Sequence, residues 1–175
     1  MVLLGKLASR IDRANTIIGR AAAWLIVAIV LVEMAVILVR YVFGLGSIWL
    51  QESIIYAHAA LFLLAAAWTL GVDKHVRVDV FYGHATPRTK AIVDLFGALV
   101  LLLPFVIVLL AYALPYVGRS WALLERSREA SGLPFVYLLK TLIPVFAVML
   151  GLQGLVQAIR AWLVLTAPPA TAEHR

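Results

Sequence analysis

The chain has 175 residues, of which 64% are hydrophobic and only 14% are charged, and its mean hydropathy is +1.00. Ordinary soluble domains are close to half apolar and a quarter charged, so this composition excludes a water-soluble globular domain and predicts a single membrane domain. The formal net charge of +6 is attributed to anionic lipid and membrane topology rather than to nucleic acid. The absence of cysteine excludes disulfides, thiolate chemistry and cysteine-ligated metals.

Residues 1–20 form an amphipathic N-terminal segment. Its apolar residues recur at helical spacing, while Lys6, Arg10 and Arg13 point elsewhere; the apolar set is Leu4, Leu7, Ile11, Ala14 and Ile18. This pattern predicts a helix that lies at the membrane interface. A continuous extension of the first spanning helix beyond the membrane explains the pattern equally well.

Four apolar runs follow, each long enough to cross the bilayer. A spanning helix needs roughly 20 mostly apolar residues to cross about 30 Å of hydrocarbon. The predicted helices cover about residues 21–43, 50–70, 91–114 and 135–165. The sequence therefore predicts an all-α integral membrane protein, with a four-helix domain at residues 21–165 and a disordered tail at residues 166–175.

The distribution of Lys and Arg predicts the orientation, because these residues are retained on the cytoplasmic side. One side carries Lys6, Arg10, Arg13, Arg20, Lys74, Arg77, Arg88, Lys90, Arg160 and Arg175. The other side carries Arg40, Arg119, Arg126, Arg128 and Lys140. Both termini are therefore expected in the cytoplasm, and the first and third connections outside.

Polar groups at membrane depth are costly and have to be explained individually. Glu33 is either a coupling-ion carboxylate or a buried carboxylate hydrogen-bonded to a neighbouring helix, and the second interpretation is favoured. His58 is interpreted as a packing histidine, because a haem would need a second histidine at matching depth. Gln153 and Gln157 lie beside Gly151 and Gly154, which indicates close helix packing rather than a substrate site.

A cluster is predicted at the outer end of the second helix. Trp49, Glu52 and Tyr56 are three and four residues apart and so share one face of the helix. Glu52 gains from its place near a helix N-terminus, and Trp and Tyr are common at this depth. Arg40, at the end of the preceding helix, is the expected partner of Glu52.

The connection after the second helix contains Lys74-His75-Val76-Arg77-Val78-Asp79-Val80, in which apolar and polar residues alternate. Alternation with period two indicates an extended segment. His75 and Asp79 make a weak metal signal, because two ligands without a third rarely hold a metal. A docking strand or a capping loop is the favoured interpretation.

Taken together, these motifs resemble the small permease subunit of tripartite ATP-independent periplasmic (TRAP) transporters over nearly the whole chain. The resemblance is carried by Arg40-Tyr41-Val42-Phe43, by Trp49-x-x-Glu52-x-x-x-Tyr56, by Lys74-His75-Val76-Arg77-Val78-Asp79 followed by Pro87, and by Ser131-Gly132-Leu133-Pro134 with Tyr137 and Pro144. Ala65 and Asp73 stand where the family commonly has glycine, which affects local packing only.

The resemblance implies an accessory role in a secondary transporter of the bacterial inner membrane that moves organic acids, usually with sodium. A large permease subunit would hold the substrate and ion sites, and a periplasmic binding protein would deliver the solute. No catalytic, cofactor or metal site is expected. The residues assigned to subunit interfaces or structure are Arg40, Trp49, Glu52, Tyr56, His75, Arg77, Asp79, Ser131, Gly132 and Pro134.

Two rival functions deserve comparison. A self-contained four-helix proton-coupled exporter would use Glu33, but such a pump requires neither the Trp49 cluster nor the segment from Lys74 to Asp79. A haem-bearing membrane anchor of a redox enzyme needs paired histidines within the membrane, and the sequence places only His58 there.

Overall fold

The computed structural model describes residues 2–72, 82 and 85–166, and all regular secondary structure within these residues is helical. Four helical segments are long and apolar enough to cross a membrane: Leu4–Phe43, Ile48–Gly71, Pro87–Ala122 and Val136–Thr166. The predicted four-helix membrane fold is therefore confirmed. The first and third segments are longer than predicted, because helix formation continues beyond the apolar runs. The predicted extended segment from Lys74 to Val80 and the tail from residue 167 lie outside the described residues.

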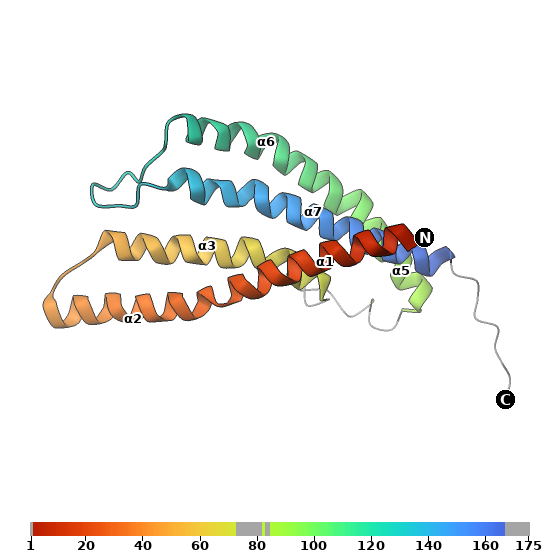
Figure 1. Cartoon of the computed structure of the whole chain (residues 1–175), viewed down its shortest axis with the longest axis horizontal. Helices are drawn as coiled ribbons and strands as arrows, with labels where there is room; N and C mark the ends of the chain where they lie inside the picture. The colour runs from red at the N-terminus through yellow and green to blue at the C-terminus, as the bar shows by residue number, and fades with distance from the viewer. Residues whose placement is uncertain (1, 73–81, 83–84, 167–175) are drawn as a thin grey trace.

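The first segment consists of α1 (Val2–Ala23) and α2 (Leu25–Phe43), which run almost straight into each other with one turn at Trp24 (Figure 1). A face of small residues on α1 packs against α3 and α7: Ala8, Asn15, Gly19 and Ala22. Leu4, Leu7 and Ile18 remain exposed. Contact of these residues with the membrane interface stays a prediction.

A tight turn joins α2 to α3 (Ile48–Gly71). Gly44 ends α2 with a left-handed φ of 67°, which glycine adopts without a steric penalty, and its N–H donates to the carbonyl of Arg40 at 3.1 Å. The Ser47 hydroxyl then accepts from the Leu50 N–H at 3.4 Å and caps α3. Helix α3 thus begins two residues before the predicted start.

The third segment combines α5 (Pro87–Phe96), a π-helix η1 (Gly97–Leu102) and α6 (Leu103–Ala122). Thr86 caps α5 by accepting from the Thr89 N–H at 3.2 Å, and Pro87 occupies the first turn, where its missing N–H costs nothing. The π-helical turns end just before Pro104, which has no N–H with which to continue an α-helical hydrogen-bond ladder.

Helix α7 (Val136–Thr166) occupies the centre of the bundle and packs against α1, α3, α5, η1 and α6. It supplies more buried positions than any other described helix, including Ala147, Leu150 and Val156. Gly151 and Gly154 allow close approach, because a Cβ on them would lie 3.0 Å from Val106 and 2.6 Å from Leu102. The predicted packing role of this glycine pair is confirmed.

The start of α1 and the end of α7 lie at the same end of the molecule, together with α5 (Figure 1). The α2–α3 turn and the α6–α7 loop lie at the opposite end. We refer to the two ends as the inner and outer end, following the predicted topology. The side of the membrane that each end faces stays a prediction.

Candidate functional site

At the outer end, the carboxylate of Glu52 fastens the α6–α7 loop to α3. The Ser127 hydroxyl donates to one carboxylate oxygen, and the Leu133 N–H donates to the other at 2.6 Å. Gly132 lies directly against this contact, since a Cβ added to it would be 2.7 Å from Glu52 Oε1. The structure thus brings together the predicted residues Glu52 and Gly132.

The predicted ion pair between Arg40 and Glu52 is wrong. The loop occupies both oxygens of Glu52, whereas Arg40 lies beside Glu33, Tyr41 and Gln51 around a separate groove. Because α3 already begins at Ile48, Glu52 stands in the second helical turn, where the field of the helix N-terminus has largely faded. Hydrogen bonds from the loop replace the predicted stabilisation by the helix dipole.

The other predicted residues of this end have different environments. Trp49 is exposed, as expected for an aromatic residue near the membrane surface. The hydroxyl of Tyr56 is buried and has no hydrogen-bond partner among the described residues. Ser131 is exposed in the loop, and Pro134 is half-buried just before α7. The cluster predicted from one helical face is therefore a mixed one, with Glu52 at its centre.

A second carboxylate, which the sequence analysis did not single out, holds the outer loop from the other side. Glu125 accepts from the Ser120 hydroxyl at 2.6 Å and from Lys140 Nζ of α7 at 2.5 Å. The hydrogen bond from Lys140, followed by that from Ser120, lowers the pKa of the Glu125 carboxyl below its ordinary value. The Lys140 ammonium also lies 4.1 Å from the ring centroid of Tyr116.

At the inner end, polar side chains join α1 to α7 inside the bundle. Asn15 Nδ2 donates to Gln153 Oε1 at 2.7 Å, and Gln153 Nε2 donates to Asp12 Oδ1 at 2.8 Å. Arg160 forms an ion pair with the other oxygen of Asp12. Gln153 is fully buried, so these partners satisfy an amide that would otherwise be costly in the interior. We call these four residues the inner network.

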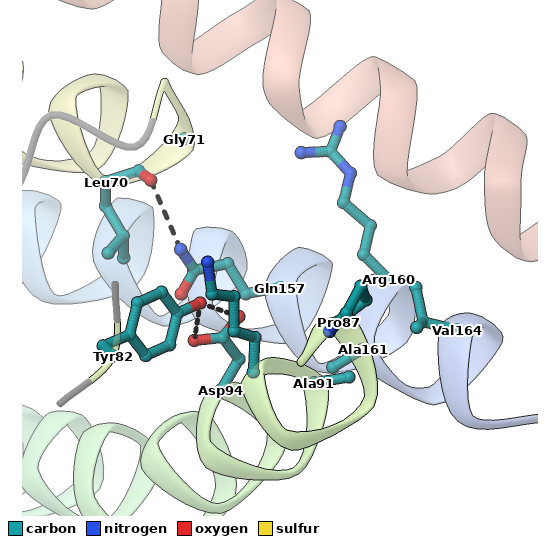
Figure 2. A pocket seen from close by; sticks show the side chains of 11 residues that line it. Leu70, Gly71, Tyr82, Pro87, Ala91, Asp94, Gln157, Arg160, Ala161 and Val164 are labelled. Carbon is teal, nitrogen blue, oxygen red and sulfur yellow. Dashed lines mark hydrogen bonds between the residues drawn. The ribbon is translucent and has the colours of Figure 1, made fainter. Parts of the chain in front are cut away.

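Beside this network lies a pocket of about 380 Å³ between α3, α5 and α7 (Figure 2). The Tyr82 hydroxyl donates to the Asp94 carboxylate at 2.8 Å and 3.0 Å, and Gln157 Nε2 donates to the Leu70 carbonyl at 3.3 Å. Arg160 points away from Asp94, towards α1. The predicted residues His75, Arg77 and Asp79 follow α3 in the chain but lie outside the described residues.

Glu33 and His58 differ from the sequence interpretation. Both side chains are exposed on the outside of the bundle, and within the described residues neither has a hydrogen-bond partner. His58 contacts Phe62, with ring centroids 5.4 Å apart. The expectation of a buried, hydrogen-bonded Glu33 is therefore wrong within the described chain, whereas His58 packs against an aromatic ring but has no hydrogen-bond partner there. The sequence pattern did not reveal this exposure, because residues that face lipid and residues buried in a helix bundle have equally apolar neighbours in the sequence.

The arrangement as a whole fastens helices to one another. Within the described part of the chain, no three His, Asp or Glu side chains are grouped so that they hold a metal ion. Both polar clusters are made of groups that hydrogen-bond to each other: Glu52 with the outer loop, and Asp12 and Asn15 with α7. These contacts join α1 to α7 and the outer loop to α3.

The comparisons with known proteins agree with this picture. The sequence model of the family described as "Tripartite ATP-independent periplasmic transporters, DctQ component" matches residues 26–164, which include α3, α5, η1, α6 and nearly all of α2 and α7. This family is a transporter component and not an enzyme family. No curated protein and no solved structure matches the chain. The chain belongs to the DctQ component family of tripartite ATP-independent periplasmic transporters and is a multi-pass membrane protein.

Proposed function

We propose that this chain is the small subunit of a sodium-driven TRAP transporter for organic acids such as carboxylates, in the bacterial inner membrane. In this role it scaffolds a large permease subunit, which carries the solute and ion sites, and helps to dock the periplasmic binding protein. Family membership supports the transporter. The coupling ion, the solute class and the docking role follow from the resemblance described above.

The observation that carries the scaffolding role is the use made of polar side chains inside the bundle. A stand-alone secondary transporter binds its solute near mid-membrane, between broken helices with converging polar groups. Here the buried polar side chains Asn15 and Gln153 bond to each other at the inner end. Glu33, the only carboxylate near the middle of a spanning segment among the described residues, is exposed on the outside of the bundle.

The outer loop supports the docking role. Its backbone is held by Glu52 on one side and by the Glu125–Lys140 pair on the other, while Arg126 and Arg128 are exposed on its surface. A fixed loop with exposed guanidinium groups suits an acidic face on a soluble partner, because charge complementarity speeds encounter and sets orientation. We propose that this loop is the surface on which the periplasmic binding protein docks.

Reconstitution tests the proposal. A tagged copy expressed with its native partners is expected to co-purify with a large permease subunit. Proteoliposomes that contain both subunits and the binding protein are expected to take up an organic acid when a sodium gradient is imposed, whereas proteoliposomes with this chain alone transport nothing. Uptake by the chain alone would support the exporter hypothesis and refute the accessory role.

The exporter hypothesis makes its own demand on Glu33. In a self-contained pump, this carboxyl has to face a cavity that the substrate enters. In a small exporter, that cavity forms between helices of the functional unit. Substitution of Glu33 would then abolish proton-coupled export by the isolated chain. The same isolated chain is inert under our proposal, so the two hypotheses predict opposite results in one preparation.

A further inference from the structure

The flank of α2 beside α3 carries two exposed charged groups that have no partner among the described residues. Glu33 and Arg40 lie two helical turns apart on this face and line a groove of about 270 Å³ with Val36, Ile37 and Gln51. Helix α2 lies at the edge of the bundle and has no buried residue, and its main packing partners in the described part of the chain are α3 and α1 (Figure 1). Nothing else in the described chain covers the groove.

The depth of Glu33 makes bare lipid an unsuitable cover. It stands ten residues before the end of α2 at Phe43, which corresponds to about 15 Å at 1.5 Å per residue. This distance is half the thickness of the hydrocarbon core, about 30 Å. A carboxyl group at mid-membrane is costly unless it faces protein or water, so a donor has to reach it there. A lipid headgroup reaches Arg40 near the surface but does not reach Glu33.

A second copy of this chain is also unsuitable. Copies of a membrane protein insert with the same orientation, so pairing this face with itself around a two-fold axis brings Glu33 against Glu33 and Arg40 against Arg40. Like charges face each other at both depths, which opposes association. The groove therefore requires a different chain with a donor opposite Glu33 and an acceptor about 10 Å closer to the outer surface, opposite Arg40.

We infer that the Glu33–Arg40 groove is the contact surface for a transmembrane helix of the large permease subunit, which presents a hydrogen-bond donor or cation to Glu33 at mid-membrane. This inference rests on the proposed function and locates one of its interfaces. It gives Glu33 a role in recognition between subunits: an apolar helix without the matching donor leaves the carboxyl unpaired and binds less well.

Photo-crosslinking tests the location. Ile37 and Leu38 are neighbours at the same depth with similar exposure, 43% and 53%, but only Ile37 lines the groove. A photoreactive amino acid at Ile37, in the co-expressed complex, is expected to give an adduct with the mass of this chain plus the large subunit, and the one at Leu38 is not. An adduct from Leu38 alone, an adduct of two small subunits, or no protein adduct at Ile37 in an intact complex would overturn the inference.

Substitution tests the chemistry. Glu33→Leu is expected to reduce the large subunit retained per tagged small subunit by roughly tenfold or more, because the partner's donor is left unpaired within the membrane. Leu31→Ala, an exposed position on the other side of α2, is the matched control and should retain as much as the wild type. Retention by Glu33→Leu equal to the control would refute the inference. If the wild-type chain itself retains no large subunit, the proposed function fails instead.

Discussion

The side chains of Asn15 and Gln153 meet in the interior between α1 and α7, with Asn15 Nδ2 2.7 Å from Gln153 Oε1. This contact joins residues that are 138 positions apart in the sequence. It lies within the inner network, where every polar group of Gln153 has a partner. The α1 segment is therefore held in the bundle by specific hydrogen bonds in addition to the packing of small residues.

A double-mutant cycle on this pair checks its contribution. Asn15→Ala and Gln153→Ala should each lower the thermal unfolding midpoint in detergent, with a coupling energy of about 0.6 kcal/mol and no more than about 1.7 kcal/mol, the range found for hydrogen bonds between membrane helices. Ser9→Ala, which removes a hydroxyl bonded within α1, serves as the control and should be additive with Gln153→Ala. Additive effects for Asn15 and Gln153 would show that their hydrogen bond contributes nothing.

Glycine substitutions test the close approach of α1 to α3. A Cβ on Gly19 would overlap with Trp68 Cβ and lie 2.8 Å from its Cγ, and Trp68 Cβ cannot move without its backbone. Gly19→Ala is expected to destabilise the protein by about 1–3 kcal/mol through overpacking. Gly118→Ala on α6, where nothing lies within 4 Å, should instead stabilise it by up to about 1 kcal/mol. Unfolding midpoints of the two variants measured in the same detergent should move in opposite directions.

Glu52→Gln tests the attachment of the outer loop. The carboxylate accepts from two donors, whereas glutamine has only one acceptor oxygen and turns its NH₂ towards either Ser127 or the Leu133 N–H. Insertion and expression should stay near normal, because loss of one such hydrogen bond costs about 1–3 kcal/mol. Uptake by the reconstituted complex should fall at limiting binding protein and recover when binding protein is in excess.

Glu129→Gln is the matched control for that experiment, since it alters an exposed carboxylate of the same loop. It should leave uptake unchanged at every concentration of binding protein. Normal uptake by Glu52→Gln, together with loss of ion coupling in a Glu33→Gln complex that still retains its large subunit, would mean that Glu33 is the functional carboxylate and would favour the exporter hypothesis.

The Glu125–Lys140 pair predicts a specific dependence of stability on pH. Because the Glu125 pKa is lower in the folded protein than in the unfolded chain, the pair stabilises fully above the ordinary carboxyl pKa. This contribution is lost as the pH falls through the lower folded-state pKa. The unfolding midpoint of the wild type should exceed that of Glu125→Gln at pH 7, and the difference should vanish in acid. Lys140→Gln should remove the same pH-dependent component; a difference that persists in acid would contradict this assignment.

Reporter fusions check the predicted orientation. Reporters fused after Arg88 and after Arg175 should both report a cytoplasmic location, and a reporter after Arg126 should report a periplasmic one. A periplasmic location for the Arg175 fusion would invert the topology. The outer loop held by Glu52 and Glu125 would then face the cytoplasm, away from any periplasmic binding protein.

The sequence predicted the four membrane-spanning segments and most of their boundaries, because spans are set by length and apolarity, which are local properties. The observed ends of the fourth span, at Val136 and Thr166, lie within a residue of the predicted ones. The third span was underestimated, since α5 begins at a Thr86 cap and carries charged residues that an apolar window leaves out.

The partners of the polar residues were not predictable. Glu52 hydrogen-bonds to residues that are 75 and 81 positions away in the sequence, and Asp12 pairs with Arg160, which is 148 positions away. Only the packed structure determines which such residues meet. Arg40 was chosen as the partner of Glu52 because it was near in the chain, but the α2–α3 turn directs it to the groove with Glu33. Helix faces that contact lipid and faces that contact protein are both apolar, so the exposure of Glu33 and His58 could not be predicted from the sequence either.

The central position of α7 has a consequence for biogenesis. Within the described chain, α7 contributes more buried positions than any other helix, and it packs against α1, α3, α5 and α6. During synthesis, α1 and α3 already have each other to pack against, but the polar side chains of Asp12 and Asn15 lack their hydrogen-bond partners on α7 until that helix inserts. A chain interrupted before α7 therefore keeps Asp12 and Asn15 without the hydrogen bonds that Gln153 provides.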